Sequence, residues 1–504
     1  MYKPITITVS NFSGGITDSL RKVVATETEF AISKHFDIFS DPTKLIPYRS
    51  LEADTETSVS ATDLKQYLVK DFVYATTSAK LYGLGQTGAG LTKIVQKADA
   101  TTGLWTLPSS SEGNGAVQNG CFIEYKDYLW GFQGTNQIFK WGLLSGTPSI
   151  TNSAATVAST ITSVANGIIA ADGNAYIAYN NVVVRIAPAG TITDSAKTVP
   201  DTYKITSLTN FGSYMAIGCS PKSTYNGQSK VFIWNLSSDL FAETIDWSEG
   251  ELRILENVEG MLVGVTDRYL NNATGAGKGS MIIQGYSGGS PQVLKEIFTQ
   301  ALTGKTIPLS KVVKNNRLFW AAKIMTNSAG TEYHEGLWSF GRKNGSYPFT
   351  MTLDIVCESA DTDGIQAFGS AANFFFITHS GDGSISKTND TAAYTYTSIY
   401  ETKIQNFYNV NLKKKLEMFT IYTAPLPASS SVTVKYRTDG NTSYTTIGTI
   451  STTGELSRDF INIESTGANF PTFKEIQFRL ESTGGAEITG YSMTALPLTG
   501  STHG

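Results

Sequence analysis

The stretch ITSLTNFGSYMAI at residues 205–217, followed by VFIW at 231–234, contains the pattern that decides the fold. An apolar run enters a tight turn at Asn210-Phe211-Gly212, a second apolar run follows, and a third ends on an aromatic residue. The same pattern appears in FIEYKDYLWG (122–131) and in KVVKNNRLFW (311–320). Runs of β-branched and aromatic residues that are separated by Gly, Asn or Asp predict strands joined by hairpins.

The pattern returns about seven times between Leu68 and Tyr400, roughly every 45 to 50 residues, which is the period of one four-stranded propeller blade. A single small sheet cannot bury both of its faces, whereas sheets arranged radially cover one another. The sequence therefore predicts an all-β protein in which residues 66–400 form a β-propeller of about seven blades. A β-solenoid is the alternative, but its repeats are usually shorter. The predicted units are 66–100, 118–150, 163–200, 203–248, 250–298, 306–356 and 362–400.

Composition supports this prediction. Of the 504 residues, 40% are hydrophobic and only 16% are charged, and Thr, Ser, Gly, Asn and Tyr take the place of the charges. Such a composition is typical of short strands joined by many turns. The net charge of −4 gives no electrostatic case for nucleic-acid binding. The basic cluster Lys413-Lys414-Lys415 is interpreted as a solvated strand entrance.

The ends of the chain do not share the repeat. Residues 1–65 are predicted to form an N-terminal arm or clasp, with a short strand at 5–9 and a helix at Glu27–Phe36. Residues 401–504 contain five or six short alternating strands and are predicted to form a β-sandwich. The inserts at 101–117 and 269–280 are rich in Gly, Ser, Thr and Asn and are predicted to be surface loops.

The sequence offers no targeting or membrane signal. The N-terminus lacks the apolar segment of a signal peptide, and no apolar run approaches the roughly 20 residues that span a bilayer. We therefore expect a protein without a membrane-spanning segment that is made in a cytoplasm.

Residues suited to catalysis or metal binding are few and scattered. The cysteines show no CxxC pair and are expected to be small hydrophobes in strands, and the histidines show no metal-binding spacing. Acidic residues are numerous enough for the paired carboxylates of a propeller glycosidase, but turn and strand-edge roles explain them better. The cysteines are Cys121, Cys219 and Cys357, the histidines are His35, His334, His379 and His503, and the acidic candidates are Glu124, Asp127, Asp172, Glu256, Glu259, Asp361 and Asp363.

Three glycine-containing segments resemble ligand-binding motifs in part of their sequence but not in their structural context or residue spacing. Gly83–Gly88 matches GxGxxG, but a second strand and not a helix follows it, so it is interpreted as a hairpin turn. Residues 275–280 lack the first glycine of a P-loop, and Asp361–Gly364 lacks the spaced ligands of a calcium-binding EF-hand. We name no catalytic, cofactor-binding or metal-ligating residue, expect no cofactor, and expect a protein that is not an enzyme.

Two segments outside the repeats carry a resemblance. Asn11-Phe12-Ser13-Gly14-Gly15-Ile16, followed by His35–Phe39 and Leu45–Arg49, resembles the opening of bacteriophage tail proteins of the nozzle (tail-tubular) type. In that family an element resembling Arg-Pro precedes the propeller. Here the proline comes first, in Pro47-Tyr48-Arg49, so the match is partial. The stretches Lys414–Pro427 and Ser431–Gly440 look like the terminal sandwich of phage structural proteins. Nozzle proteins are generally larger, with extra domains among the blades.

The resemblance implies a non-enzymatic virion component, assembled in the host bacterial cytoplasm, with copies arranged around the tail axis. The implied partners are portal, adaptor or tail proteins, and cyclic homo-oligomers fit this role. It carries over no catalytic residue. Two alternatives remain from the residues themselves. One is a propeller displayed on the virion that binds a host-surface glycan or receptor through aromatic loops, and the other is a glycan-cleaving enzyme.

Overall fold

The computed structural model is all β in the part of the chain that it describes, namely residues 3–14, 29–54, 67–97, 103–108, 110–222, 227–269, 279–299, 306–325, 333–357, 364–379, 383–409, 411–461 and 470–498. The chain divides into two compact units. The propeller unit comprises residues 51–336 and 357–388, and the sandwich unit comprises residues 1–50, 337–356 and 389–504. Each unit is therefore built from segments that are far apart in the sequence.

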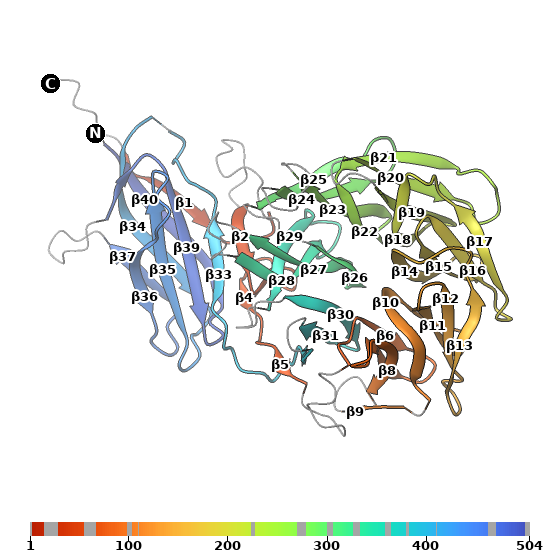
Figure 1. The fold of residues 1–504 in the computed structure, drawn as a ribbon. Helices are drawn as coiled ribbons and strands as arrows, with labels where there is room; N and C mark the ends of the chain where they lie inside the picture. The colour runs from red at the N-terminus through yellow and green to blue at the C-terminus, as the bar shows by residue number, and fades with distance from the viewer. Residues whose placement is uncertain are drawn as a thin grey trace. The chain divides into compact units, whose positions relative to one another are not determined.

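The propeller unit contains the predicted series of small antiparallel sheets (Figure 1). The first blade uses β6 (Asp71–Ala75), β7 (Lys80–Gln86), β8 (Leu91–Lys97) and β9 (Trp105–Thr106), and the second uses β10 (Glu112–Tyr125), β11 (Tyr128–Gln133), β12 (Gln137–Gly142) and β13 (Ser149–Thr156). The third uses β14 (Val164–Ile169), β15 (Ala175–Tyr179), β16 (Val182–Ile186) and β17 (Ile192–Thr198), and the fourth uses β18 (Tyr203–Phe211), β19 (Tyr214–Pro221), β20 (Gln228–Trp234) and β21 (Glu243–Glu249). The fifth uses β22 (Glu251–Val258), β23 (Met261–Tyr269), β24 (Gly279–Tyr286) and β25 (Gln292–Thr299).

The last two blades are built less regularly. The sixth begins with β26 (Thr306–Lys314), β27 (Arg317–Met325) and β28 (Tyr333–Gly341), and the division between the units falls within β28. The seventh contains β30 (Ile365–Ala371), β31 (Phe374–His379) and β32 (Ile385–Lys387), and its fourth strand is β5 (Glu52–Ala53) from the start of the unit. The hairpins of the quoted repeats lie where the sequence predicts them, with Tyr125 opposite Tyr128 and Phe211 opposite Tyr214.

The ring is closed. The innermost strands contact one another in the order β6, β10, β14, β18, β22, β26 and β30, and β30 contacts β6 again. Apolar residues are buried between successive blades and not within one sheet. Tyr82 of the first blade packs edge-on against Trp141 of the second, with ring centroids 5.5 Å apart, and Tyr176 of the third packs likewise on Trp234 of the fourth at 5.8 Å. Burial between blades explains why the repeat ends on aromatic residues.

A charged cluster lies where the ring closes. Asp54, just after β5, is bound by the Lys97 ammonium at 3.1 Å and by the Trp105 indole N–H at 2.7 Å. Lys387 of the seventh blade lies 3.5 Å from the same carboxylate. The side chains of Asp54 and Lys97 have no exposed surface. One carboxylate thus joins the first blade, the last blade and the segment that completes the ring.

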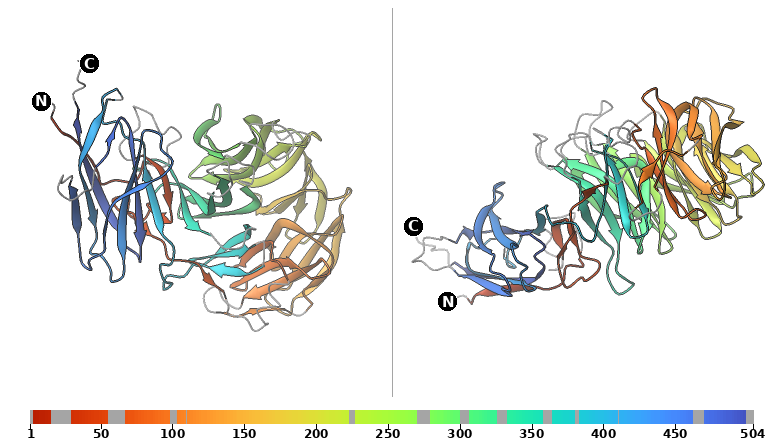
Figure 2. Two further views of the ribbon diagram at one scale, coloured as in Figure 1. Left: turned by 60° about the vertical axis from the view of Figure 1, so that its left-hand side comes forward. Right: turned by 90° about the horizontal axis from the view of Figure 1, so that it is seen from below.

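The sandwich unit contains two sheets. In the first the order is β1 (Ile5–Val9), β40 (Ile488–Pro497), β34 (Lys414–Thr423) and β37 (Ser457–Ile461), with β38 (Thr472–Phe473) on β34. In the second the order is β29 (Thr350–Val356), β2 (Phe30–Lys34), β33 (Ser398–Thr402), β39 (Ile476–Thr483), β35 (Ser431–Thr438) and β36 (Thr445–Ile450). β3 (Phe36–Asp37) and β4 (Ile46–Pro47) form a small separate ladder. Figure 2 shows the red strand β1 beside the blue C-terminal strands.

Three sequence predictions need correction. The helix predicted at Glu27–Phe36 is wrong over the described residues, because 30–34 form β2, which pairs with β33. The surface loop predicted at 101–117 is wrong at both β9, which pairs with β8 and buries Trp105, and β10, which begins at Glu112 and also pairs with β8. The predicted boundaries near residues 65 and 400 do not coincide with the observed division, because β1 and β2 lie in the sheets of the sandwich.

The buried N-terminal turn explains part of the quoted motif. The Phe12 side chain is fully buried and meets the Tyr400 ring edge-on, with centroids 5.3 Å apart. The Phe12 N–H donates to the Pro42 carbonyl at 2.8 Å, and the Thr350 hydroxyl donates to the Ser13 carbonyl at 2.5 Å. The turn therefore holds β1 and the following segment on the sandwich. Gly15 and Ile16 lie outside the described residues.

Candidate functional site

The centre of the propeller contains one residue that breaks the repeat. In six blades the innermost strand and the second strand form a regular hairpin, and the fourth residue pair from the turn can be compared between blades. Five of these blades have Leu or Phe there, and the sixth blade has Lys311, opposite Trp320. The equivalents are Phe72, Phe122, Leu208, Leu255 and Phe368.

The Lys311 ammonium is bound by two neighbouring blades. It donates to the carbonyl oxygens of Leu255 at 2.6 Å and Leu208 at 3.1 Å, which belong to its own equivalents in the fifth and fourth blades. It also donates to the Ser207 hydroxyl at 2.9 Å and lies 3.0 Å from the Glu256 carboxylate. An innermost strand pairs along one edge only, so the carbonyls on its inner edge need other donors. The Lys311 ammonium supplies such donors to the Leu208 and Leu255 carbonyls.

A polar network continues from this point into the third blade. The Asn166 side chain donates to the Leu208 carbonyl at 2.9 Å, while its own carbonyl oxygen accepts from the Leu208 N–H at 2.9 Å and the Ser207 hydroxyl at 3.2 Å. The Thr209 hydroxyl donates to the second oxygen of Glu256. Side chains from four successive blades thus bind one another's backbone. We call Asn166, Ser207, Thr209, Glu256 and Lys311 the central cluster.

Electrostatics favour a structural role for the central cluster. Burial lowers the pKa of Lys311, while the Glu256 carboxylate opposes that shift. Only 8% of the Lys311 side chain is exposed, and its three N–H donors face four acceptors. A lysine that serves as a nucleophile must be reachable and neutral. Lys311 is instead a cation that cross-links three innermost strands.

Asp71, on the innermost strand of the first blade, is the second unusual group. Desolvation raises the pKa of Asp71 to about 7, against the opposing effect of the Phe72 and Phe122 N–H groups. The Phe72 N–H donates to its carboxylate at 2.8 Å. The nearby Cys121 thiol is fully buried, and burial raises its pKa. A thiol whose pKa is raised is unreactive.

The acidic candidates of the sequence are not gathered at one place. The Glu124 carboxylate accepts the Thr76 and Thr77 N–H groups, and Asp127 accepts the Ser145 N–H. Asp172 closes its own hairpin by accepting from Asn174 and the Tyr176 hydroxyl. Glu256 alone belongs to the central cluster. Glu259 occupies a turn with φ of 52°, and Asp361 and Asp363 lie outside the described residues.

The other motifs have structural places where they are described. The hairpin predicted at Gly83–Gly88 is present, but its turn begins at Thr87, and Gly83–Gln86 lie in strand β7. The three cysteines are buried and unpaired by disulfide. His35 is fully buried in the sandwich, His334 and His379 lie in strands, and His503 and Lys278 are outside the described residues. No group of three His, Cys, Asp or Glu in the described chain is placed to bind a metal.

The basic cluster Lys413-Lys414-Lys415 does mark a strand entrance, since β34 begins at Lys414. The prediction that it is solvated is wrong for Lys414, which has no exposed surface. Its ammonium donates to the carbonyls of Asn409, Leu412 and Lys474, the latter two at 2.7 and 3.1 Å. Like Lys311, this lysine binds backbone oxygens that strands leave unpaired.

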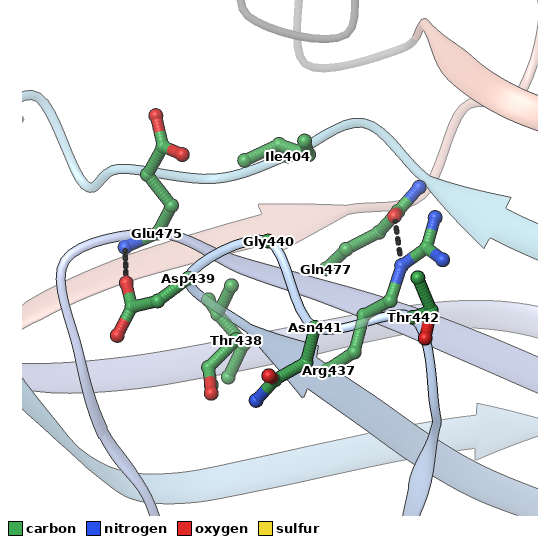
Figure 3. A pocket seen from close by; sticks show the side chains of 10 residues that line it. Ile404, Arg437, Thr438, Asp439, Gly440, Asn441, Thr442, Glu475 and Gln477 are labelled. Carbon is green, nitrogen blue, oxygen red and sulfur yellow. Dashed lines mark hydrogen bonds between the residues drawn. The ribbon is translucent and has the colours of Figure 1, made fainter.

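The sandwich has a small open hollow of about 160 Å³ at the turn between β35 and β36. Figure 3 shows Glu475 and the Arg437–Gln477 pair on opposite sides of Gly440. The Asp439 carboxylate accepts the N–H groups of Lys474 and Glu475 at 2.9 and 3.0 Å, which fixes the turn. The hollow is thus lined by the Glu475 carboxylate, the exposed Asn441 amide and the Arg437 guanidinium, while the Gln477 amide is buried.

Sequence reasoning missed Lys311, although it begins one of the quoted repeats. The signal that identifies it is an alignment of the repeats on their hairpins, in which a lysine stands among leucines and phenylalanines. Asn166 and Lys414 gave no such signal, because their partners come from distant segments.

Comparisons with known proteins identify no family for this chain. No protein-family model matches the chain, and no curated protein matches its sequence. Virginiamycin B lyase from Staphylococcus aureus is similar in structure, at 10% identity and a TM-score of 0.42, over 68% of this chain and 98% of that one. The Pan2 WD40 domain of Neurospora crassa is similar at 9% identity and a TM-score of 0.38, over 69% of this chain and 96% of that one. BamB from Moraxella catarrhalis is similar at 12% identity and a TM-score of 0.34, over 63% of this chain and 82% of that one.

These similarities say nothing about activity, and the propeller assignment is based on the sheets described above. The described chain contains no helix that is long and apolar enough to cross a membrane.

Proposed function

We propose that the chain is a non-enzymatic structural protein of a bacteriophage virion, placed in the tail as a nozzle or tail-associated component. The sandwich unit, which includes the N-terminal strands, docks on portal, adaptor or tail proteins, and the propeller serves as a rigid platform. Copies assemble around the tail axis. This proposal rests on the resemblance of residues 11–16 and 414–440 to phage tail proteins, together with the structural observations below.

The observation that carries the non-enzymatic part is the central cluster. The centre of a propeller is where ligands are often bound, and here its cation is bound by the protein's own oxygens. The acids that could serve as a catalytic pair are held in separate turns. Among the described residues, such an arrangement supports a role in stabilising the ring over a catalytic role.

Electron microscopy of purified virions tests the location. We expect density for the propeller and sandwich at the tail, in a copy number that matches the local rotational symmetry. The protein should co-purify with tail proteins in a fixed ratio. Copies scattered over the capsid, or absence from purified virions, would overturn the proposal.

A second experiment tests the absence of catalysis. The double substitution Lys311→Leu with Glu256→Gln removes both charges of the central cluster while giving the sixth blade the residue type of its neighbours. If the variant chain folds, phage carrying it should assemble and infect with an unchanged titre. A large loss of infectivity by a folded variant that still enters virions would show that these charges do more than stabilise the ring, and would overturn this part of the proposal. Asp246→Asn, which removes a surface ion pair with Lys230, is the matched control.

The hollow on the sandwich favours one alternative, a virion-displayed protein that binds a host-surface glycan. Carboxylate, amide and guanidinium groups at Glu475, Asn441 and Arg437 are suited to sugar hydroxyls. Arg437→Ala should then abolish binding to host polysaccharide, whereas Arg458→Ala, at a strand edge outside the hollow, should not. Equal binding by both variants, or no binding by the parent chain, excludes this alternative.

A further inference from the structure

A guanidinium in the hollow of the sandwich has no acidic partner among the described residues. Arg437, near the end of β35, lines this hollow. Its contacts are with two neutral groups, the amide oxygen of Gln477 and the ring of Tyr444. No carboxylate of the described chain lies within ion-pair distance of it. The charge of Arg437 is therefore available to a ligand.

A buried amide fixes the orientation of this guanidinium. Arg437 and Gln477 face each other on the paired strands β35 and β39. The Gln477 amide N–H donates to the Thr402 carbonyl at 2.7 Å, so its amide oxygen is turned toward Arg437 and accepts the Nε–H at 2.8 Å (Figure 3). Gln477 is only 2% exposed, and the Tyr444 ring centre lies 4.7 Å from the guanidinium carbon. The guanidinium is thus held at Nε and on one face.

The terminal nitrogens of Arg437, Nη1 and Nη2, form no hydrogen bond with the described residues. Both lie in the plane of the guanidinium, and together they form a fork that binds a carboxylate through two parallel hydrogen bonds. A group that is already held in its binding orientation loses less freedom when a ligand arrives. The hollow therefore contains a fork that is preorganised for a carboxylate.

The neighbouring cations on the same face of the sheet are already neutralised. Lys435 pairs with Glu481 at 2.7 Å, and the Arg479 Nε–H donates to Glu401 at 2.7 Å. Charged groups at a protein surface are usually compensated in this way when they are partly buried. Arg437 differs from both neighbours, because its partners are neutral.

The acids of the hollow, Asp439 and Glu475, lie on the side away from the guanidinium (Figure 3). The Asp439 carboxylate accepts two backbone N–H groups, and both acids raise the pKa of the buried Lys414 against the effect of burial. Lys414 thus offsets their charge. The Glu475 carboxylate and the exposed Asn441 amide can accept hydrogen bonds from hydroxyl groups. The hollow therefore offers a cation on one side and acceptors on the other.

We propose that the hollow binds an acidic sugar, with the sugar carboxylate on the Arg437 fork and sugar hydroxyls on the acceptors opposite. A uronic-acid unit carries a carboxylate and several hydroxyl groups on one small ring, which matches this arrangement. An acidic peptide side chain supplies the carboxylate without the hydroxyl donors. The inference rests on the glycan-binding alternative described above, and it does not depend on a location in the tail.

Electrophoresis of the full chain through gels that contain a polysaccharide tests the proposal. We expect polygalacturonate, a polymer of uronic acid, to retard the parent chain, and dextran, a neutral polymer, to leave it unretarded. Arg437→Gln should abolish the retardation. Arg437→Lys should weaken binding about tenfold, because an ammonium keeps the charge but loses the fork. Arg458→Gln is the matched control. It removes the same charge from an arginine that pairs with Glu455, and it should be retarded like the parent.

Melting temperatures show whether each variant is folded. An unretarded parent chain, or equal retardation of the parent and a folded Arg437→Gln variant, would overturn the proposal. Equal retardation by polyglutamate would also overturn it, because the site would then accept any polymeric carboxylate. If dextran retards the parent and Arg437→Gln abolishes that effect, the glycan-binding alternative stands and the inference of a carboxylate fails. Electron microscopy of virions tests the tail location separately.

Discussion

The propeller and the sandwich differ in how each stabilises its most completely buried lysine, Lys97 and Lys414 respectively. In the propeller, Asp54 pairs with Lys97 and Lys311 pairs with Glu256, so each charge has an opposite charge from another blade. In the sandwich, Lys414 is bound by three backbone carbonyls, and burial keeps His35 neutral by lowering its pKa from 6.5 to about 4. A closed ring can bring complementary side chains from different blades together. In the sandwich, carbonyls near strand ends bind Lys414, whereas the less buried Arg479 pairs with Glu401 across β39 and β33.

This difference has consequences for stability. Removing one member of a buried ion pair leaves the other without compensation, which costs more than the pair itself contributes. Removing a cation that is bound by carbonyls leaves neutral groups unpaired, which costs less. The propeller should therefore be the more sensitive unit to single charge substitutions.

The largest expected effect is that of Asp54→Asn. Lys97 would remain fully buried without its counter-charge, and we expect a loss of about 3 to 5 kcal/mol in the free energy of unfolding. Six of the seven tryptophans lie in the propeller unit, so urea unfolding followed by tryptophan fluorescence reports on that unit. Asp246→Asn is the control. The Asp246 side chain is 70% exposed in its pair with Lys230, so this substitution should lower the free energy of unfolding by less than about 1 kcal/mol. Equal losses for the two variants would contradict the comparison.

The next effect is at Lys311. Lys311→Leu removes one donor each from the Leu208 and Leu255 carbonyls and leaves Glu256 without its cation, so we expect a loss of about 2 to 4 kcal/mol in the free energy of unfolding. Adding Glu256→Gln removes the unpaired charge, and the double variant should recover about half of that loss. Fluorescence-detected urea unfolding of the two variants and of Glu256→Gln gives the coupling energy. Additive losses would show that the two residues do not act as a pair.

The repeat allowed the propeller to be predicted from sequence, because a hairpin and its flanking strands are local. Phe211 and Tyr214 are three residues apart, and the pattern of apolar residues fixes their register. The strand at 30–34 could not be predicted in this way. Its partner begins at Ser398, and pairing with so distant a strand outweighs local helix preference.

The candidate site was predictable only in part. The repeats themselves show that Lys311 replaces a leucine or phenylalanine, but they do not show that its ammonium reaches the fourth and fifth blades. The burial of Lys414 was unpredictable because the Lys474 carbonyl that it binds lies sixty residues away. Charged residues are almost never fully buried without partners, so a sequence pattern alone favours the solvated interpretation.

The third prediction concerns pH and the sandwich. The pKa of His35 is lower in the folded chain than in the unfolded chain, so the unfolded state binds more protons between about pH 6.5 and pH 4. The stabilisation is complete above pH 6.5 and falls as the pH decreases, by about 3 kcal/mol at pH 4. Hydrogen exchange of peptides that cover residues 30–48 measures this loss. His35→Asn removes the titrating group and suits the φ of 64° at this position, so its exchange should depend less on pH. An identical pH dependence in both proteins would exclude His35 as the cause.

The smallest expected effect is that of Lys414→Met, which separates the two modes of stabilisation most directly. Methionine fills nearly the same space but donates no hydrogen bond, so the carbonyls of Asn409, Leu412 and Lys474 lose a shared donor. We expect a loss of about 1 to 3 kcal/mol, below that of Asp54→Asn, because no charge remains uncompensated. Hydrogen exchange at the start of β34 measures it, and Lys413→Met, at the exposed neighbouring position, should change the exchange by less than about 0.5 kcal/mol. A loss equal to that of Asp54→Asn would mean that Lys414 acts through the charges of Asp439 and Glu475, which raise its pKa against the effect of burial. The sandwich would then stabilise its buried lysine as the propeller does.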